Sequence, residues 1–178
     1  MRRNRNRMEG RRQRGFSLIE VMIAMAVLLI AMAGFFGAFT MAVGQTASQG
    51  EDATRTTEYA QDKIEQLMAL SFADGATNTT VYPPGATGGT GMGGTMAAST
   101  TVGGINSAAP VTGYVDYLNS AGTLLTSSTG AFYRRQWTIT TDASATLKTI
   151  TVFSSAMKSV APGPLPSTTL VCLKTNTQ

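Results

Sequence analysis

The stretch Arg14-Gly15-Phe16-Ser17-Leu18-Ile19-Glu20, followed by the uncharged and mostly apolar run from Val21 to Gly44, decides how this chain is organised. The run has 24 residues, and at about 1.5 Å per residue it forms an α-helix of about 36 Å. This exceeds the hydrocarbon core of a bilayer, which is about 30 Å thick. We therefore expect a membrane-spanning helix. Glu20 lies just inside its start, where a carboxylate at membrane depth is costly unless it is paired.

Basic residues, then Gly15, then the sequence Phe16-Ser17-Leu18-Ile19-Glu20-Val21 resemble the N-terminal processing and methylation motif of type IV prepilins and of type II secretion pseudopilins. The resemblance implies that a prepilin peptidase cleaves between Gly15 and Phe16, and that the new terminus on Phe16 is N-methylated. It also implies that Glu20 pairs with the terminal ammonium of an adjacent subunit during assembly. A buried carboxylate needs a cation, so association would neutralise both charges. The alternative is that Glu20 is solvated near the headgroups; the two states can follow one another.

The charge of the chain is concentrated before the apolar run. Residues 1–15 contain seven Arg and Glu9, a net charge of +6, and the seven basic and nine acidic residues that follow give −2. A basic arm can bind nucleic acid. Directly before a membrane helix, however, the positive-inside rule explains it better, with the leader cytoplasmic and the C-terminal part exported. We therefore expect residues 1–15 to be a cleaved leader and expect no nucleic-acid partner.

An ordinary signal peptide is a second alternative for the N-terminal region. Ala24-Met25-Ala26 and Ala31-Met32-Ala33 both fit a small-x-small cleavage site. The apolar run is nevertheless longer than the usual h-region of about 7 to 15 residues. The prepilin interpretation is therefore favoured.

One long helix is predicted from near Phe16 to about Leu70, with residues 16–44 as its membrane or filament-core half and residues 45–70 as an amphipathic half. Gly34 and Gly37 each cost about 1 kcal/mol relative to Ala inside a helix. They either allow the helix to stretch or unwind in a filament, or form a small-residue face for close packing. An apolar stripe at helical spacing follows in the second half: Ala53, Ala60, Ile64, Leu67 and Met68.

Residues 71–110 are predicted to form a connecting loop rich in Gly and Thr, with eight glycines between Gly85 and Gly104. Such a segment has little apolar mass to bury and a backbone that is costly to order, so we expect a mobile surface loop. Within it, Gly89–Gly94 spells G-x-G-x-x-G. That pattern indicates dinucleotide binding only between a strand and a helix, and neither flank qualifies.

Residues 111–178 are predicted to form an antiparallel sheet of about four strands. Turn signals at Asn119-Ser120-Ala121-Gly122 and Asp142-Ala143-Ser144-Ala145 separate segments with alternating apolar residues. The simplest way to bury both elements is to lay this sheet on the stripe of the helix. The predicted fold is therefore α+β and pilin-like.

The sequence offers few candidates for catalysis or cofactor binding. It contains no histidine, which excludes nucleophilic activation by His and His-based metal sites, and we expect no enzyme, metal or cofactor. Carboxylates on the helix are interpreted as solvated charges or subunit contacts: Asp52, Glu58, Asp62 and Glu65. Trp137 beside Arg134 and Arg135 is interpreted as an aromatic that covers the core, flanked by solvated arginines. Cys172 is the only cysteine, so no intramolecular disulfide can form, and we expect a buried, small apolar side chain.

The resemblance extends more loosely to Ala60–Leu67, Tyr133–Ile139 and Leu147–Val152, which are similar to V-type minor pilins and I-type minor pseudopilins. It implies a subunit in the inner membrane, with its N-terminus cytoplasmic and its C-terminal part periplasmic, which then moves to the pilus on the cell surface. Implied partners are prepilin peptidase, other major and minor pilins, an inner-membrane assembly platform and lipid. The predicted function is to prime pilus assembly and support motility and adhesion. The alternatives are a minor pseudopilin of type II secretion and a membrane-anchored extracytoplasmic binding protein.

Overall fold

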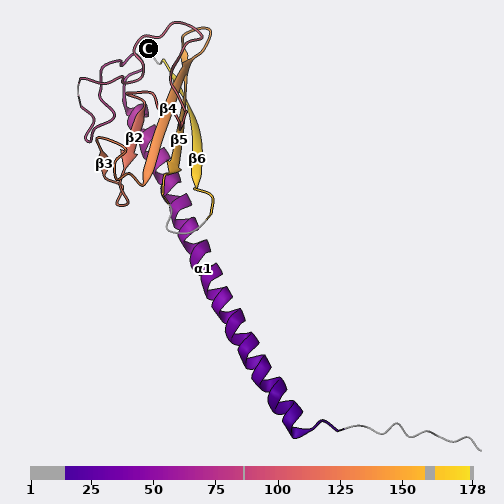
Figure 1. Cartoon of the computed structure of the whole chain (residues 1–178). Helices are drawn as coiled ribbons and strands as arrows, with labels where there is room; N and C mark the ends of the chain where they lie inside the picture. The colour runs from indigo at the N-terminus through magenta and orange to yellow at the C-terminus, as the bar shows by residue number, and fades with distance from the viewer. Residues whose placement is uncertain (1–14, 86, 159–162, 177–178) are drawn as a thin grey trace, which may run out of the picture. The chain divides into compact units, whose positions relative to one another are not determined.

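The computed structural model describes residues 15–85, 87–158 and 163–176 (Figure 1). The predicted leader therefore lies outside the described residues, except for Gly15. The chain divides into two compact units, Met1–Val43 and Gly44–Gln178. Helix α1 spans Leu18–Ala69 and has 52 residues. It begins in the first unit and ends in the second, and it confirms the prediction of one long helix.

The second unit contains an antiparallel sheet in which the strand order is β3-β2-β4-β5-β6 (Figure 1). Its strands are β1 (Thr101–Gly103), β2 (Val115–Leu118), β3 (Leu124–Leu125), β4 (Tyr133–Thr141), β5 (Leu147–Ala156) and β6 (Ser167–Thr175). The predicted antiparallel sheet on a long helix is thus confirmed. The described sheet has six strands where about four were expected.

The short strand β1 lies inside the segment that was predicted to be a loop. Strand β2 pairs with β4 as far as Val115 opposite Gln136. Strand β1 then continues along the same edge of β4, with Gly103 opposite Thr138. Two short segments therefore share the edge that one long strand would otherwise occupy.

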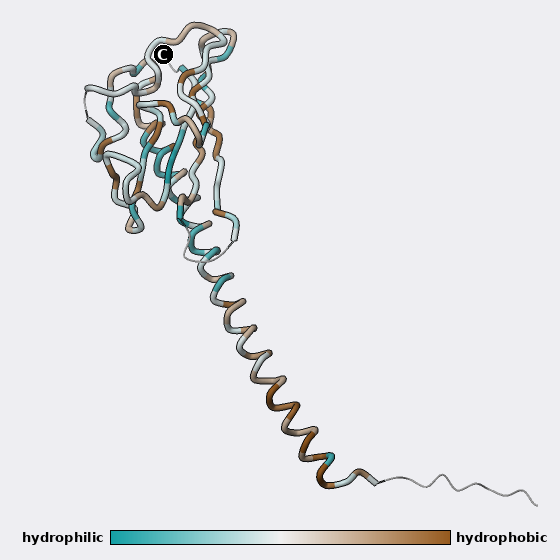
Figure 2. Tube along the Cα trace, in the orientation of Figure 1, coloured by the Kyte–Doolittle hydropathy of each residue, from teal (hydrophilic) through white to brown (hydrophobic). Residues whose placement is uncertain are grey.

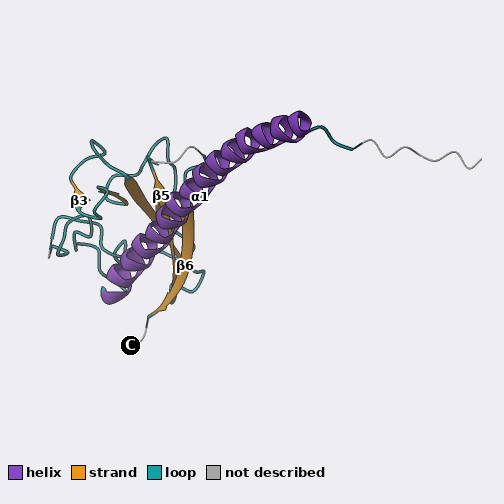
Figure 3. Cartoon of the chain, turned by 90° about the horizontal axis from the view of Figure 1, so that it is seen from below, coloured by secondary structure: helices purple, strands orange, loops and turns teal. Residues whose placement is uncertain are grey.

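The C-terminal part of α1 lies across one face of the sheet (Figure 3). Its buried residues are Thr56, Ala60, Lys63 and Leu67, whose spacing keeps them on one helix face. The expected stripe is therefore partly wrong, because Ala53 is exposed and two of the buried positions are polar. Thr56 can be buried because its hydroxyl donates to the carbonyl of Ala53 (2.8 Å). The same hydroxyl lies 3.3 Å from the hydroxyl of Thr168.

The apolar core centres on Trp137, which is fully buried between the helix and the sheet. Ile139, Ile150 and Val152 share its face, as the alternation in β4 and β5 predicts. Met92, which is also fully buried, and Met96 join this core from the Gly-rich segment. The expectation that the segment has little apolar mass to bury is therefore wrong, because these flexible side chains fill the core from a loop.

Lysines from distant strands bind backbone carbonyl groups at and just after the C-terminal end of α1. Lys174 donates from Nζ to the carbonyl oxygens of Met68 (2.6 Å) and Leu70 (2.5 Å). Lys148 donates to those of Phe72 (2.6 Å), Met92 (2.8 Å) and Gly94 (2.8 Å). The last turn of α1 has no basic residue of its own. Lys174 therefore satisfies a carbonyl that the helix leaves unpaired and complements its dipole, whereas Lys148 joins the backbone that follows the helix to the Gly-rich segment.

The predicted turn between β4 and β5 is organised by Asp142. Its Oδ1 accepts hydrogen bonds from the backbone amides of Thr146 and Leu147, both at 2.8 Å. Its Oδ2 accepts one from the hydroxyl of Ser144 at 2.7 Å. These donors, the Leu147 amide foremost, lower the pKa of Asp142 from 3.8 to about 2. The ionised carboxylate therefore holds the turn that joins β4 to β5.

Replacing Asp142 by Ala is expected to reduce stability at neutral pH and to have a smaller effect in acid. The pKa is lower in the folded state than in the unfolded state, so the carboxylate stabilises the fold above the unfolded value and ceases to do so as the pH falls toward about 2. The measurement is the free energy of unfolding of both proteins at neutral pH and at about pH 2. Glu65→Ala, at an exposed helix position, is the control. An Asp142→Ala effect of equal size at both pH values would contradict the prediction.

Candidate functional site

The first turn of α1 is built on the carbonyl of Ser17. This oxygen accepts hydrogen bonds from the backbone amides of Glu20 (3.0 Å) and Val21 (3.2 Å). Gly15 and Phe16 precede the helix in extended or irregular backbone, and the side chain of Phe16 is 82% exposed. The predicted scissile bond between Gly15 and Phe16 therefore lies just outside the helix, where a peptidase could reach the backbone.

Glu20 is exposed on the first turn of the helix. A carboxylate is favourable at this position, because the amide end of a helix carries partial positive charge. Among the described residues, no ion pair includes Glu20. The single chain therefore offers this carboxylate no compensating cation within its described part, and pairing with a neighbouring subunit stays a prediction.

The helix that follows exposes apolar side chains on every side. Large apolar residues from Phe16 to Val43 are between 47% and 82% exposed, and Figure 2 shows that this part of the chain is predominantly hydrophobic. By length and composition, α1 is long and apolar enough to cross a membrane. Such a surface needs lipid or other protein to cover it.

Gly34 and Gly37 lie within continuous helix. A Cβ atom at either position would meet no other atom within 4 Å. The single chain therefore gives neither glycine a packing role. Both proposals for them, local unwinding and close helix packing in a filament, stay predictions about the assembled state.

A group of charged side chains in the second unit was missed at the sequence level. We call Lys63, Asp116, Arg135 and Asp62 the ionic cluster. Oδ2 of Asp116 lies 2.7 Å from Nζ of Lys63 and 2.8 Å from Nη2 of Arg135, and a second nitrogen of Arg135 bridges to Asp62. Lys63 is fully buried, and Asp116 and Arg135 are 2% and 3% exposed. The cluster therefore joins α1 to β2 and β4 through buried charges.

Lys63 is held by three different partners. Its ammonium donates to the carbonyl of Thr79 at 2.7 Å and lies 4.1 Å from the ring centroid of Trp137. Burial lowers the pKa of Lys63 to about 8, although the carboxylate of Asp116 opposes this shift. The sequence contained one signal for this arrangement: Lys63 falls at helical spacing between Ala60 and Leu67, where a solvated lysine would not be expected.

Several sequence interpretations of charged residues need correction. Arg135 is buried and not solvated, because Asp116 and Asp62 neutralise it. Asp116, one of the two carboxylates, lies in β2. Asp52 and Asp62 contact the sheet of their own chain: the Tyr133 hydroxyl donates to Asp52 at 2.9 Å, and Asp62 pairs with Arg135. Two of the four helix carboxylates therefore stabilise the fold.

The structure also describes the surroundings of Cys172 and of the glycine pattern Gly89–Gly94. The thiol of Cys172 is half-buried and lies 3.7 Å from the sulfur of Met68, so its expected full burial is wrong. Gly89–Gly94 forms turns that are bound to the backbone of Asp74 and Thr77, with no strand or helix directly on either side. Within the described residues, no group of His, Cys, Asp and Glu could hold a metal ion.

The family model for the prokaryotic N-terminal methylation motif matches residues 10–36. A comparison with curated proteins found no match, and neither did a comparison with solved structures. The motif implies processing by a prepilin peptidase, and proteins that carry it in this context are structural and not enzymatic. The chain therefore combines the prokaryotic N-terminal methylation motif with a pilin-like α+β fold, a combination that indicates a type IV pilin-like protein.

Proposed function

We propose that this protein is a minor subunit of a type IV pilus. In this proposal it is inserted in the inner membrane, cleaved between Gly15 and Phe16, methylated on Phe16, and assembled into the fibre or at its tip. The observation that carries the proposal is the methylation motif joined to a helix that leaves its apolar side chains uncovered. Lipid covers this surface before assembly, and neighbouring pilins cover it afterwards.

Glu20 has a specific role in this proposal. In the fibre, the same surface is buried among other subunits, where an unpaired carboxylate would be strongly unfavourable. Cleavage before Phe16 creates a new ammonium group four residues away in sequence, which every subunit carries. Pairing between Glu20 of one subunit and the terminal ammonium of its neighbour neutralises both charges. Because this ammonium exists only after cleavage, assembly depends on prior cleavage.

The other expected partners belong to the same pathway. They are prepilin peptidase, other major and minor pilins, and an inner-membrane assembly platform. The motif supports the peptidase directly, while the remaining partners rest on the resemblance. The proposed role is to prime assembly and support motility and adhesion, with the N-terminus cytoplasmic before cleavage and the second unit periplasmic.

The test is the intact mass and the N-terminal peptide of the protein recovered from membranes and from sheared surface fibres. We expect a chain that begins at methylated Phe16 in both fractions. Gly15→Leu is expected to retain the leader, whereas Gly50→Leu, at a helix glycine with open space around its Cβ position, should be cleaved normally. A mature chain found only in membranes would instead support a type II secretion pseudopilin. A chain that retains Met1, or begins after Ala26 or Ala33, would contradict the proposal.

A further inference from the structure

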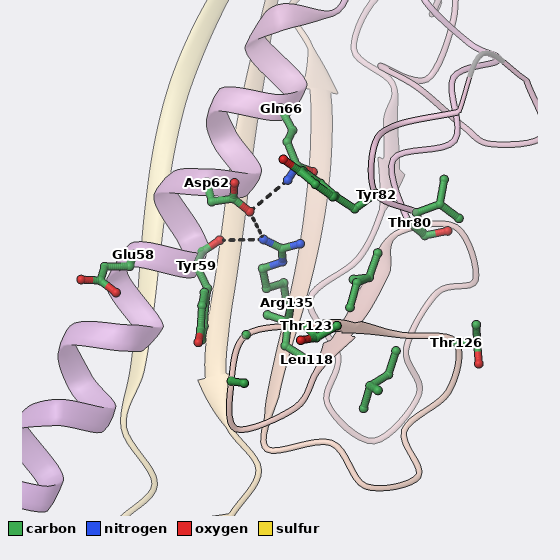
Figure 4. Close-up of a pocket in the computed structure, with 15 residues that line it drawn as sticks. Glu58, Tyr59, Asp62, Gln66, Thr80, Tyr82, Leu118, Thr123, Thr126 and Arg135 are labelled. Atoms are coloured by element: carbon green, nitrogen blue, oxygen red, sulfur yellow. Dashed lines mark hydrogen bonds and ion pairs between the residues drawn. The ribbon is translucent and has the colours of Figure 1, made fainter.

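A groove in the second unit lies between the C-terminal part of α1, residues 80–82 and the β2–β3 hairpin (Figure 4). Its volume is about 680 Å³. The helix contributes one wall, which carries Glu58, Tyr59, Asp62 and Gln66. No residue of the methylation motif lines the groove. The groove is therefore distinct from the residues that are proposed to act in fibre assembly.

The polar atoms that remain available on the helix wall are hydrogen-bond acceptors. The side chain of Asp62 is 53% exposed although it pairs with Arg135. Nε2 of Gln66 donates to Asp62 at 2.9 Å (Figure 4), whereas Oε1 of Gln66 is enclosed by the protein and is not offered to a ligand. Glu58 adds an exposed carboxylate at the rim. A ligand that satisfies these groups must therefore supply N–H or O–H donors, and a positive charge is favoured.

Arg135 lines the groove but is already committed to partners within the chain. Its Nε and Nη2 donate to Asp116 at 3.2 and 2.8 Å. Its Nη1 donates to Asp62 and, at 3.3 Å, to the carbonyl of Tyr59. Four of the five N–H groups of this guanidinium are therefore used. The groove consequently has little capacity to bind an anion.

The opposite wall is apolar and borders a free strand edge. It contains Leu124 and Leu125, together with Val81 and Tyr82, which are 41% and 79% exposed. Leu124 and Leu125 form β3, the end strand of the sheet among the described strands. An end strand offers backbone groups that an added extended segment can pair with. A peptide backbone can pair with these groups along the strand, whereas a small cation cannot, so the strand edge favours a peptide ligand.

We infer that the groove binds an extended segment of another protein that carries an arginine or lysine flanked by apolar residues. The basic side chain lies against Asp62 and the ring of Tyr82, which are both exposed and where carboxylate and aromatic groups both favour a cation. The apolar flanks cover Leu124 and Leu125, and the backbone runs along β3. The inference does not depend on the proposed pilus function.

The test uses the full chain in uncharged detergent micelles and fluorescence anisotropy of the labelled peptide Gly-Leu-Arg-Leu-Gly. The matching peptide with Gln in place of Arg is expected to bind about fivefold more weakly. Tyr82→Ala, which removes an exposed ring, should weaken binding of the arginine peptide by about fivefold. Because the peptide substitution leaves the protein unchanged, weaker binding of the Gln peptide would not reflect a loss of folding.

Matched charge variants separate the groove from general electrostatic attraction. Glu58→Gln is expected to weaken binding of the arginine peptide by about two- to threefold. Glu65→Gln removes the same charge from an exposed position of α1 that does not line the groove, and should leave affinity unchanged. The inference is wrong if the two peptides bind equally, if neither binds, or if both Glu variants weaken binding alike. Agmatine carries the guanidinium group of arginine without a peptide backbone. If it bound as tightly as the arginine peptide, the inference that the groove binds an extended segment would be wrong.

Discussion

Asp116→Ala is expected to lower the free energy of unfolding by about 3–5 kcal/mol, because removing one partner of a buried ion pair leaves the other charges buried and uncompensated. Asp116 accepts from both Lys63 and Arg135. Arg135 would retain Asp62 as a partner, but Lys63 would retain only the carbonyl of Thr79 and the ring of Trp137. Denaturant unfolding of the full chain measures the effect, and the fluorescence of Trp137, the single tryptophan, reports it.

Two variants give this measurement its controls. Glu65→Ala removes an exposed carboxylate of α1 and should change stability by less than about 0.5 kcal/mol, as surface substitutions usually do. Lys63→Met combined with Asp116→Leu removes both charges of one pair, and it should cost less than the sum of the single substitutions because the two sites are in contact. If Asp116→Ala costs no more than the surface variant, the ionic cluster does not hold the helix to the sheet.

Glu20→Ala is expected to leave cleavage and membrane insertion intact while incorporation into fibres falls by about 100-fold or more. In the proposed assembly, the substitution leaves the Phe16 ammonium of a neighbouring subunit buried without its carboxylate, at a cost of about 3–5 kcal/mol, and about 1.4 kcal/mol corresponds to a tenfold change in affinity. The measurement is the ratio of this protein in sheared fibres to that in membranes, together with the N-terminal peptide of each fraction.

Glu51→Ala is a suitable comparison for the assembly measurement. Glu51 lies on the same helix, and its carboxylate is 2.8 Å from Nη2 of Arg55 at i,i+4 spacing. This exposed pair contributes little, and its loss should leave incorporation within about twofold. Normal incorporation of Glu20→Ala would exclude the pairing of Glu20 with a subunit terminus. Failure of both variants would show that the assay responds to any lost carboxylate on α1.

The sequence was informative where short-range patterns determine structure. The uncharged run after Glu20 predicted a long helix, and α1 confirms it. Alternating apolar residues around Trp137 predicted a strand of an antiparallel sheet, and β4 (Tyr133–Thr141) confirms it. The Asn119 turn also forms, with its Oδ1 accepting from the amides of Ala121 and Thr123 at 2.9 Å. Each of these features depends on residues that are close in sequence.

The features that were not predicted depend on pairs of residues far apart in the chain. The position of Lys63 between Ala60 and Leu67 indicates a buried side chain, but nothing near Lys63 in sequence indicates that its partner is Asp116 of β2. Met92 and Met96 lie in a glycine-rich segment whose average composition predicts no core residues. The motif residues are different: Gly15, Phe16 and Glu20 were found from the motif itself, and their roles depend on other proteins.

The binding of the helix end by Lys174 has a consequence for the order in which the chain is made. The carbonyls of Met68 and Leu70 precede this lysine by 106 and 104 residues. At a synthesis rate of about 5 to 20 residues per second, α1 waits about 5 to 20 seconds before its last turn acquires this partner. A nascent chain arrested before Ser167 would contain the helix and β5 but lack β6, leaving both the helix end and a sheet edge bound only to water. The second unit therefore completes folding late, after its final strand has emerged.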